Sequence, residues 1–234
     1  MPRPAFFTRH RANMMFDFSS VIQAWPLFLE GIWLTCVLTV VSCTAGTLLG
    51  TACAWGRIQG PRWLKVVLGC YVELFRNTPF IIQIFFIFFG LASAGLKMSA
   101  VPASLIALVL NLGAYACEIV RAGIEATPKG QVEAAQSLAL SRWQIFTRVM
   151  VAPALARVWP ALTSQLVIIM LASSVCSQIS AEEVSYAANF VAGKTFRSFE
   201  SFMVVTGCYL VLAIILRKAL LVMGPRFVFG RMKF

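Results

Sequence analysis

Long apolar runs without charges dominate this sequence and limit what it can fold into. A bilayer core needs about 20 consecutive apolar residues in a helix. Hydrophobic residues make up 59% of the chain and charged residues only 12%, whereas soluble domains carry about 25% charged residues. The sequence therefore predicts an all-α, polytopic membrane protein. We expect about five transmembrane helices, near 27–54, 64–91, 100–121, 158–179 and 202–216.

The positive charge of the chain reflects membrane topology. A net charge of +11 would suggest a nucleic-acid partner for a soluble protein. Here Lys and Arg fall in short segments between the spans, where they fix orientation. If the C-terminus is cytoplasmic and the N-terminus outside, most basic residues lie inside. The outside loops then hold only Lys97, Lys194 and Arg197.

The first residues depart from this topology and do not resemble a signal peptide, because no apolar run leads to a cleavage site. Three arginines would lie outside: Arg3, Arg9 and Arg11. We therefore predict that the natural start is Met14 or Met15 and that 1–13 is not native. The lead-in that follows is expected to place aromatic rings at headgroup depth: Phe16, Phe18 and Trp25.

Motifs for catalysis, metal or nucleotide are missing or false. Gly193, Lys194 and Thr195 resemble the end of a phosphate-binding loop, but the pattern needs glycine where the chain has Ala188. The only histidine is His10, and the seven cysteines lie in apolar runs without paired spacing. We expect no metal site, no membrane-embedded enzyme, and an energy source on another chain.

The stretch from Glu133 to Pro153, EAAQSLALSRWQIFTRVMVAP, is the longest polar run between two apolar spans. Just before it, Thr127 offers a capping hydroxyl and Pro128 suits the first helical position. These residues predict a short helix that ends near Leu138.

A second short helix is predicted directly afterwards. Ser141 and Gln144 fit a capping box, and the helix should run through Trp143, Phe146 and Val149. Two short amphipathic helices with a bend between them suit a groove on another protein. The alternative is that both helices lie on the membrane surface.

The second span is interrupted by polar residues and a proline: Glu73, Arg76, Asn77 and Pro79. Ionisable groups at this depth are costly and usually face a partner or an aqueous path. Glu73 and Arg76 are three residues apart and can pair, as can Glu118 and Arg121 in the third span. Pro79 should kink or break the helix. Either the kink is purely structural or its polar groups line a path, and we favour the second.

Small residues recur every four positions in the first span: Ser42, Gly46, Gly50 and Ala54. Such a ridge lets another helix approach closely. Because glycine is common in membrane helices in general, the ridge has two equally good interpretations.

Four segments together resemble a known family. EAAQSLALSRWQIFTRVMVAP looks like the EAA loop of permease subunits of bacterial ATP-binding-cassette importers. LFRNTPFIIQIFFIFFG, GAYACEIVRAGIEATPKGQVEAAQSL and TFRSFESF are similar to its polar amino-acid branch, and the resemblance covers 16–221. It divides the chain into an N-terminal lead-in (1–26), a type-1 permease domain (27–221) and a cytoplasmic tail (222–234).

The resemblance implies a permease subunit in the bacterial plasma (inner) membrane that forms the path for a polar amino acid. The alternative solute is an opine or another small amine-containing molecule. Implied partners are a cytoplasmic ATPase subunit, an extracytoplasmic amino-acid-binding protein, a second permease subunit (a copy or a sister) and the lipid bilayer. ATP and Mg would be bound by the ATPase, so this chain has no cofactor and is not an enzyme.

The resemblance gives the loop the role of coupling to the ATPase. Glu133, near a helix start, can accept hydrogen bonds from a partner cleft. Small side chains keep the first helix slim, and larger ones supply apolar contact. The coupling candidates are Glu133, Ala134, Ala135, Leu138, Ala139, Ser141, Trp143, Phe146 and Pro153.

The loop departs from the family pattern at two places. The family glycine is Ala139 here, and if that site needs a positive φ, alanine costs roughly 1 kcal/mol or forces another bend. The downstream proline is Pro153, whereas Ala152 holds the expected place. We therefore expect the start of the fourth span to be rotated or shifted.

A third departure lies in the fourth span, where family members often carry lysine, then Asp or Asn, Thr, Ser and Leu. Leu171 and Ala172 lack the cation and the carboxylate or carboxamide, while Ser173 and Ser174 keep hydroxyls. We hypothesise an uncharged or unusual substrate, or a sister subunit with the main pocket. The substrate-path candidates are Arg76, Asn77, Glu118, Arg121, Leu171, Ala172, Ser173 and Ser174.

Overall fold

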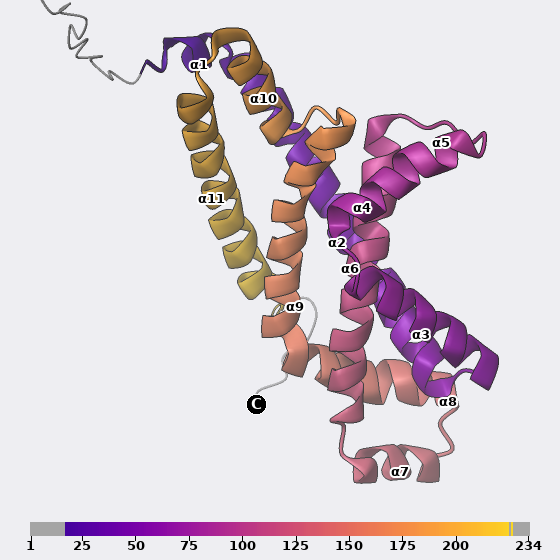
Figure 1. The fold of residues 1–234 in the computed structure, drawn as a ribbon. Coiled ribbons are helices and arrows are strands. Elements are labelled where there is room, and N and C mark those ends of the chain that lie inside the picture. Colours follow the sequence, from indigo (N-terminus) through magenta and orange to yellow (C-terminus); the bar gives the residue numbers. More distant parts are fainter. Residues whose placement is uncertain (1–16, 225, 227–234) are drawn as a thin grey trace, which may run out of the picture.

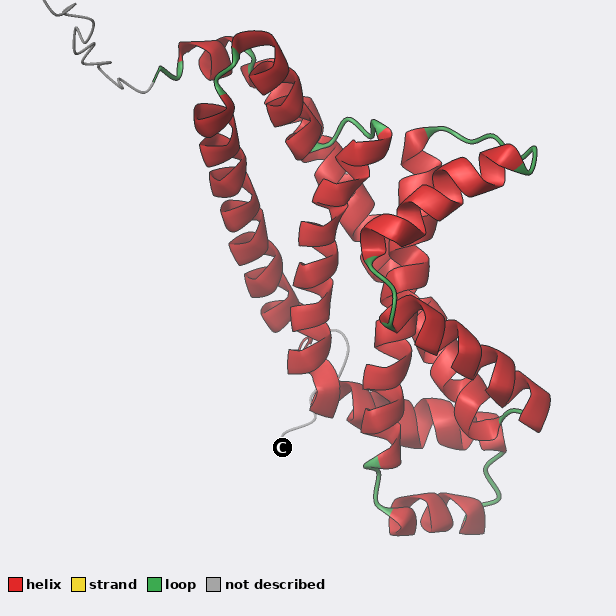
Figure 2. Ribbon diagram, viewed as in Figure 1, coloured by secondary structure: helices red, strands yellow, loops and turns green. Residues whose placement is uncertain are grey.

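The computed structural model describes residues 17–224 and 226, and every regular element in this part is a helix (Figure 2). Four helices are long and apolar enough to cross a membrane. Two further helices, bent by 111° at a short break, make a fifth crossing if the pair counts as one span. The prediction of an all-α fold with about five spans is confirmed.

Three groups of helices make up the described part. The continuous spans are α2 (Trp25–Gln59), α6 (Ala100–Glu125), α9 (Ala152–Ala172) with its 3-10 extension η3 (Ser173–Ile179), and α11 (Ser198–Met223). The broken crossing comprises α3 (Arg62–Arg76), α4 (Phe80–Phe85), the π-helical turn η1 (Phe86–Gly90) and α5 (Leu91–Ser93). The remaining elements are α1 (Ser19–Gln23), α7 (Lys129–Ser137), α8 (Arg142–Gln144), the π-helical η2 (Ile145–Val151) and α10 (Val184–Thr195).

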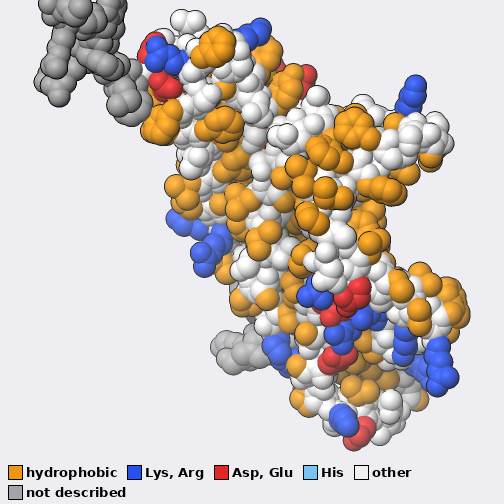
Figure 3. All heavy atoms as spheres, in the orientation of Figure 1, with side chains coloured by type: hydrophobic (Ala, Val, Ile, Leu, Met, Phe, Trp, Pro, Cys, Tyr) orange, Lys and Arg blue, Asp and Glu red, His pale blue; other side chains and the backbone are white. Residues whose placement is uncertain are grey.

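The long helices α2 and α6 form the centre of the bundle (Figure 1). On one side α3 and α4 diverge as a V, and on the other side α9 and α11 run together. The short helices α7 and α8 lie across one end, called here the α7 end, whereas α1 and α10 lie at the opposite end. Hydrophobic side chains cover much of the surface between the two ends (Figure 3).

The small-residue ridge of α2 is the contact surface for α6. All four residues of the ridge are buried. A Cβ at Gly46 would lie 2.8 Å from the Leu112 side chain, and one at Gly50 would lie 2.5 Å from the Cβ of Ala116. Of the two interpretations left open by the sequence, the structure supports a ridge that permits close helix packing.

The predicted outside loop after the fourth span contains a helix, α10, that sequence reasoning missed. Glu183 caps it by accepting the backbone N–H groups of Ser185 and Tyr186, at 2.8 and 3.2 Å. Its carboxylate also accepts from Thr35 of α2 at 3.3 Å and from the Tyr209 hydroxyl of α11. Glu183 is completely buried, so this loop residue ties three helices together.

Other bounds also differ from expectation. The span expected at 202–216 extends over Ser198–Met223, because its flanking charged residues are accommodated within the helix. The false phosphate-binding motif ends α10, the wrong helix terminus for a phosphate site. Several predicted features lie outside the described residues: Arg3, Arg9, His10, Arg11, Met14, Met15 and Phe16.

Candidate functional site

The connection between α7 and α8 is closed by two local motifs. Ser141 and Gln144 form the predicted capping box, since the Ser141 N–H donates to Gln144 Oε1 at 2.9 Å and the Gln144 N–H donates to Ser141 Oγ at 3.3 Å. Ala139 has a φ of +54°. Its N–H donates to the Gln136 carbonyl, and the Leu140 N–H donates to that of Ala135. This is a Schellman motif with alanine at the position that favours glycine.

The start of α7 differs from the prediction. The helix begins at Lys129 with Pro128 as its N-cap residue. Thr127 is therefore one residue too early to cap the first turn, and its buried hydroxyl has no hydrogen-bond partner. The predicted Thr127 cap is wrong.

The second short helix is also not separate, because α8 continues through η2 directly into α9. Figure 1 shows this segment running across the α7 end before it turns into the bundle. Pro153 lies in the first turn of α9, directly after the π-helical η2. A proline ring displaces the carbonyl of the preceding turn, which fits the local widening in η2. The expected rotation or shift of this helix start relative to the family stays a prediction.

The loop has one exposed face and one buried face. Glu133, Ala134 and Leu138 are exposed, and Trp143 is 58% exposed although its ring also contacts Trp55 at 5.5 Å between centroids. We call these four residues, Glu133, Ala134, Leu138 and Trp143, the exposed loop face. Ser141 and Ala139 are exposed between the two helices.

Two coupling candidates point inward instead. Ala135 is buried, and Phe146 is 3% exposed within a core cluster that includes Val72 and Ile124. The apolar contact expected from Phe146 toward another protein is therefore contradicted. The reason is that the Phe146 ring of η2 packs against Trp55 of α2, so this turn faces the bundle.

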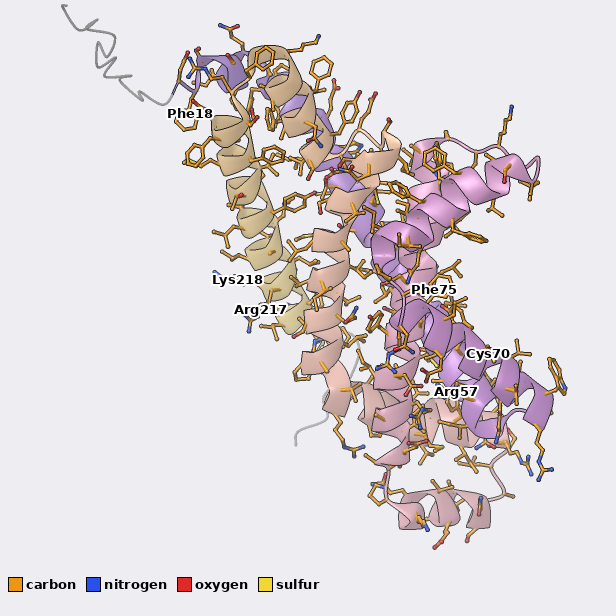
Figure 4. All side chains as sticks on the ribbon, in the orientation of Figure 1. Phe18, Arg57, Cys70, Phe75, Arg217 and Lys218 are labelled. Atoms are coloured by element: carbon orange, nitrogen blue, oxygen red, sulfur yellow. The ribbon has the colours of Figure 1, made fainter. Side chains whose placement is uncertain are left out.

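A four-charge cluster lies near the α7 end (Figure 4). The predicted pair is confirmed, with Arg121 Nη2 at 2.7 Å from Glu118 Oε2. Arg121 also contacts Glu125 at 2.6 Å, and Arg57 of α2 pairs with the second oxygen of Glu118. Sequence reasoning missed Arg57, which is 61 residues away from its partner. Glu118 and Arg121 thus join α2 to the last turns of α6.

The break in the second crossing forms an elbow, defined here as 73–83. The helix α3 ends at Arg76, and Pro79 is the N-cap residue of α4, so the predicted break is confirmed. The predicted Glu73–Arg76 pair is wrong. Glu73 Oε2 accepts from the Asn77 amide at 2.8 Å, and the Arg76 guanidinium lies 5.6 Å from the centroid of the Tyr115 ring.

A buried amide holds the elbow, and sequence reasoning missed it. Gln83 Nε2 donates to the carbonyls of Phe75 (labelled in Figure 4) and Thr78 at 2.8 and 3.0 Å. Its Oε1 accepts from Asn111 Nδ2 of α6 at 2.9 Å. Because the break leaves carbonyls at the end of α3 without helical partners, Gln83 replaces the missing donors. An uncharged polar residue inside an apolar span was the available signal.

The candidates in the fourth span lie apart from the elbow residues in the chain, at the junction of α9 and η3. Ser173 is buried and donates to the Met170 carbonyl at 2.6 Å, and Ser174 donates to the Leu171 carbonyl at 2.7 Å. Both hydroxyls thus bond their own helix, while Leu171 is exposed and Ala172 half-buried. The eight substrate-path candidates therefore fall into three groups: the elbow, the four-charge cluster and this junction.

Comparison with known proteins places this architecture. Residues 46–227 match the family described as binding-protein-dependent transport system inner membrane component. A putative glutamine transport system permease protein from Rickettsia bellii is 30% identical over 86% of this chain and 94% of its own length. An octopine transport system permease protein from Rhizobium radiobacter is 29% identical over 88% of this chain and 87% of its own length.

A solved structure agrees with these relatives. A chain of the crystal structure titled as an amino acid ABC transporter with histidines superposes with a TM-score of 0.81 at 31% identity, covering 92% of this chain and all of that one. Together with the family match over most of the sequence, these similarities settle the assignment. The chain belongs to the family of inner membrane components of binding-protein-dependent transport systems.

Proposed function

We propose that this chain is the permease subunit of an importer for a polar amino acid and is driven by an ATPase on a separate chain. The observation that carries the coupling role is the exposed loop face, which lies across the α7 end with both of its helices locally capped. An acidic residue beside exposed apolar side chains suits a groove on a partner. The names of the relatives support the amino-acid substrate, and the octopine relative supports an opine as the alternative.

Family membership supports the proposed assembly. A second permease subunit completes the path, an extracytoplasmic protein delivers the solute, and the ATPase binds ATP and Mg. Basic residues near the α7 end support a cytoplasmic location for that end, among them Arg57, Arg62 and Lys65. The N-terminus would then lie outside and the C-terminus inside. ATP binding by the partner would move the loop and change access to the path.

Co-purification tests the coupling loop. Glu133→Lys reverses the charge of the exposed loop face and should reduce recovery of the co-expressed ATPase. The matched control is Glu182→Lys, the same change at an exposed residue near the opposite end. Equal ATPase recovery with both variants would contradict the proposed contact. A bulky residue at Ala135 is not a suitable test, because this side chain is buried within the chain itself.

Reconstitution tests the substrate class. The permease is inserted into liposomes with its ATPase and binding protein, and polar amino acids and opines are screened for stimulation of ATP hydrolysis. We expect stimulation by at least one α-amino acid. If neither class of solute stimulates hydrolysis, the proposed function is wrong.

A further inference from the structure

The elbow carries exposed polar groups at a depth where lipid cannot solvate them. Glu73, Arg76 and Asn77 are exposed, although they lie at the break of a bent helix pair that is long and apolar enough to cross a membrane as one span. The elbow contacts α6 through Asn111 and Tyr115. At 1.5 Å per residue, Asn111 is about 17 Å from the start of α6 and about 21 Å from its end. Charges near mid-depth need water or protein around them, so the elbow faces an aqueous path or a partner subunit.

The two charges of the elbow do not neutralise each other. Neither Glu73 nor Arg76 forms an ion pair within the described residues. The same three-residue spacing produces a 2.7 Å pair between Glu118 and Arg121. Opposite charges that are close in the chain but unpaired are complementary to a zwitterion. A guanidinium binds a carboxylate through two parallel hydrogen bonds, and a carboxylate binds an ammonium group.

The surrounding contacts hold these groups in place before any ligand arrives. The Tyr115 hydroxyl donates to the Arg76 carbonyl at 3.4 Å, under the guanidinium that lies over the same ring. Gln83 and Asn111 fix the break itself. A preorganised site loses less conformational entropy on binding, and broken helices supply solute sites in other transporters.

We propose that the elbow is a binding site for the zwitterionic backbone of an α-amino acid. Arg76 binds the carboxylate, and Glu73, oriented by Asn77, binds the ammonium group. Gln83 and Asn111 are positioning residues that hold the elbow in its bent form. The inference rests on the proposed import of an amino acid and deepens it, because it assigns recognition of the charged ends to residues outside the α9–η3 junction.

Ligands that lack one charged group test this site directly. The complex of permease and ATPase is purified in detergent without the binding protein, and equilibrium binding is measured by calorimetry. The probe is the amino acid that most stimulates the wild type in the reconstitution screen, with its decarboxylated amine and its deaminated acid. If that amino acid is L-glutamine, the analogues are 4-aminobutanamide and glutaramic acid. The wild type should bind the amino acid about tenfold more tightly than either analogue.

The variants should show a crossed pattern. Arg76→Gln should bind the amino acid and its amine with affinities within about twofold, while discrimination against the acid remains. Glu73→Gln should lose discrimination against the acid and keep it against the amine. Arg76→Lys keeps the positive charge but loses the paired donors of the guanidinium, so its discrimination against the amine should lie between those of the wild type and Arg76→Gln. A general loss of folding would weaken all three ligands equally, so the crossed pattern identifies direct contacts.

The positioning residues have a different signature. Gln83→Leu should weaken the amino acid and both analogues by similar factors, and its effect should shrink when combined with Arg76→Gln. Recovery of the co-expressed ATPase should not change, because the exposed loop face is not altered. The matched control is Thr163→Val, which removes a buried hydroxyl that has no hydrogen-bond partner and should leave binding unchanged.

Two negative results have different meanings. If an amino acid stimulates the wild type but Arg76→Gln and Glu73→Gln leave discrimination unchanged, the elbow site is refuted and the proposed function stands. If no amino acid stimulates ATP hydrolysis by the wild type, the proposed import of amino acids fails and the elbow site fails with it.

Discussion

Replacing Ala139 with glycine should stabilise the coupling loop. Ala139 is exposed and has a φ of +54° at the end of α7, so its methyl group meets the backbone unfavourably without gaining any burial. Glycine removes roughly 1–2 kcal/mol of this strain. Part of the gain is lost because glycine has greater backbone freedom when the loop is locally unfolded. A net gain of about 0.5–1 kcal/mol corresponds to about twofold to fivefold less opening.

Hydrogen exchange of the loop measures this change. The amides of Leu138 and Leu140 donate to the carbonyls of Ala134 and Ala135, so they are protected only while the end of α7 is formed. In Ala139→Gly both amides should exchange about twofold to fivefold more slowly, under conditions in which exchange reports the opening equilibrium.

The matched control is Ala134→Gly, the same atomic change at an exposed residue inside α7. Glycine within a helix costs about 1 kcal/mol relative to alanine, so exchange should become faster. Slower exchange in Ala139→Gly and faster exchange in Ala134→Gly would support the left-handed conformation at Ala139. If Ala139→Gly also speeds exchange, the loop bends in another way and the reasoning is refuted.

Three other changes test the bundle, each through thermal unfolding of the detergent-purified chain. Gly50→Ala should lower the free energy of unfolding by about 1–3 kcal/mol, because the added Cβ would lie 2.5 Å from the Cβ of Ala116 in α6. The control is Gly69→Ala, whose Cβ would have no atom within 4 Å, so this change should be neutral or slightly stabilising. Burial raises the pKa of the Glu183 carboxyl above its usual 4.5, so the folded state favours the protonated carboxyl. The free energy of unfolding should therefore fall as pH rises from 4.5 through the raised pKa. In Glu183→Gln this dependence on pH should be weaker. Arg57→Ala leaves Glu118 with a single basic partner and should cost about 1–2 kcal/mol, which Arg57→Lys should partly restore.

The features predicted correctly from the sequence depend on residues close together in the chain. The capping box needs only Ser141 and Gln144, and the break at Pro79 needs only the proline ring. Two local predictions were wrong: the Thr127 cap, because the helix start was placed one residue too early, and the Glu73–Arg76 pair, because Glu73 accepts from Asn77 instead. Apart from Phe146, whose side chain is buried within the chain, the roles of the coupling and substrate-path residues stay predictions, because neither the fold nor the similarities test them.

The sequence alone determined that this chain is a helical membrane protein with a broken second crossing, because run length, charge and proline act locally. Only the tertiary structure decided which polar groups neutralise one another. Arg57 pairs with Glu118 across 61 positions and Gln83 with Asn111 across 28, whereas neighbouring Glu73 and Arg76 do not pair with each other. The hydrogen-bond partner of a polar side chain comes from the helix packed against it, and local sequence does not identify that helix.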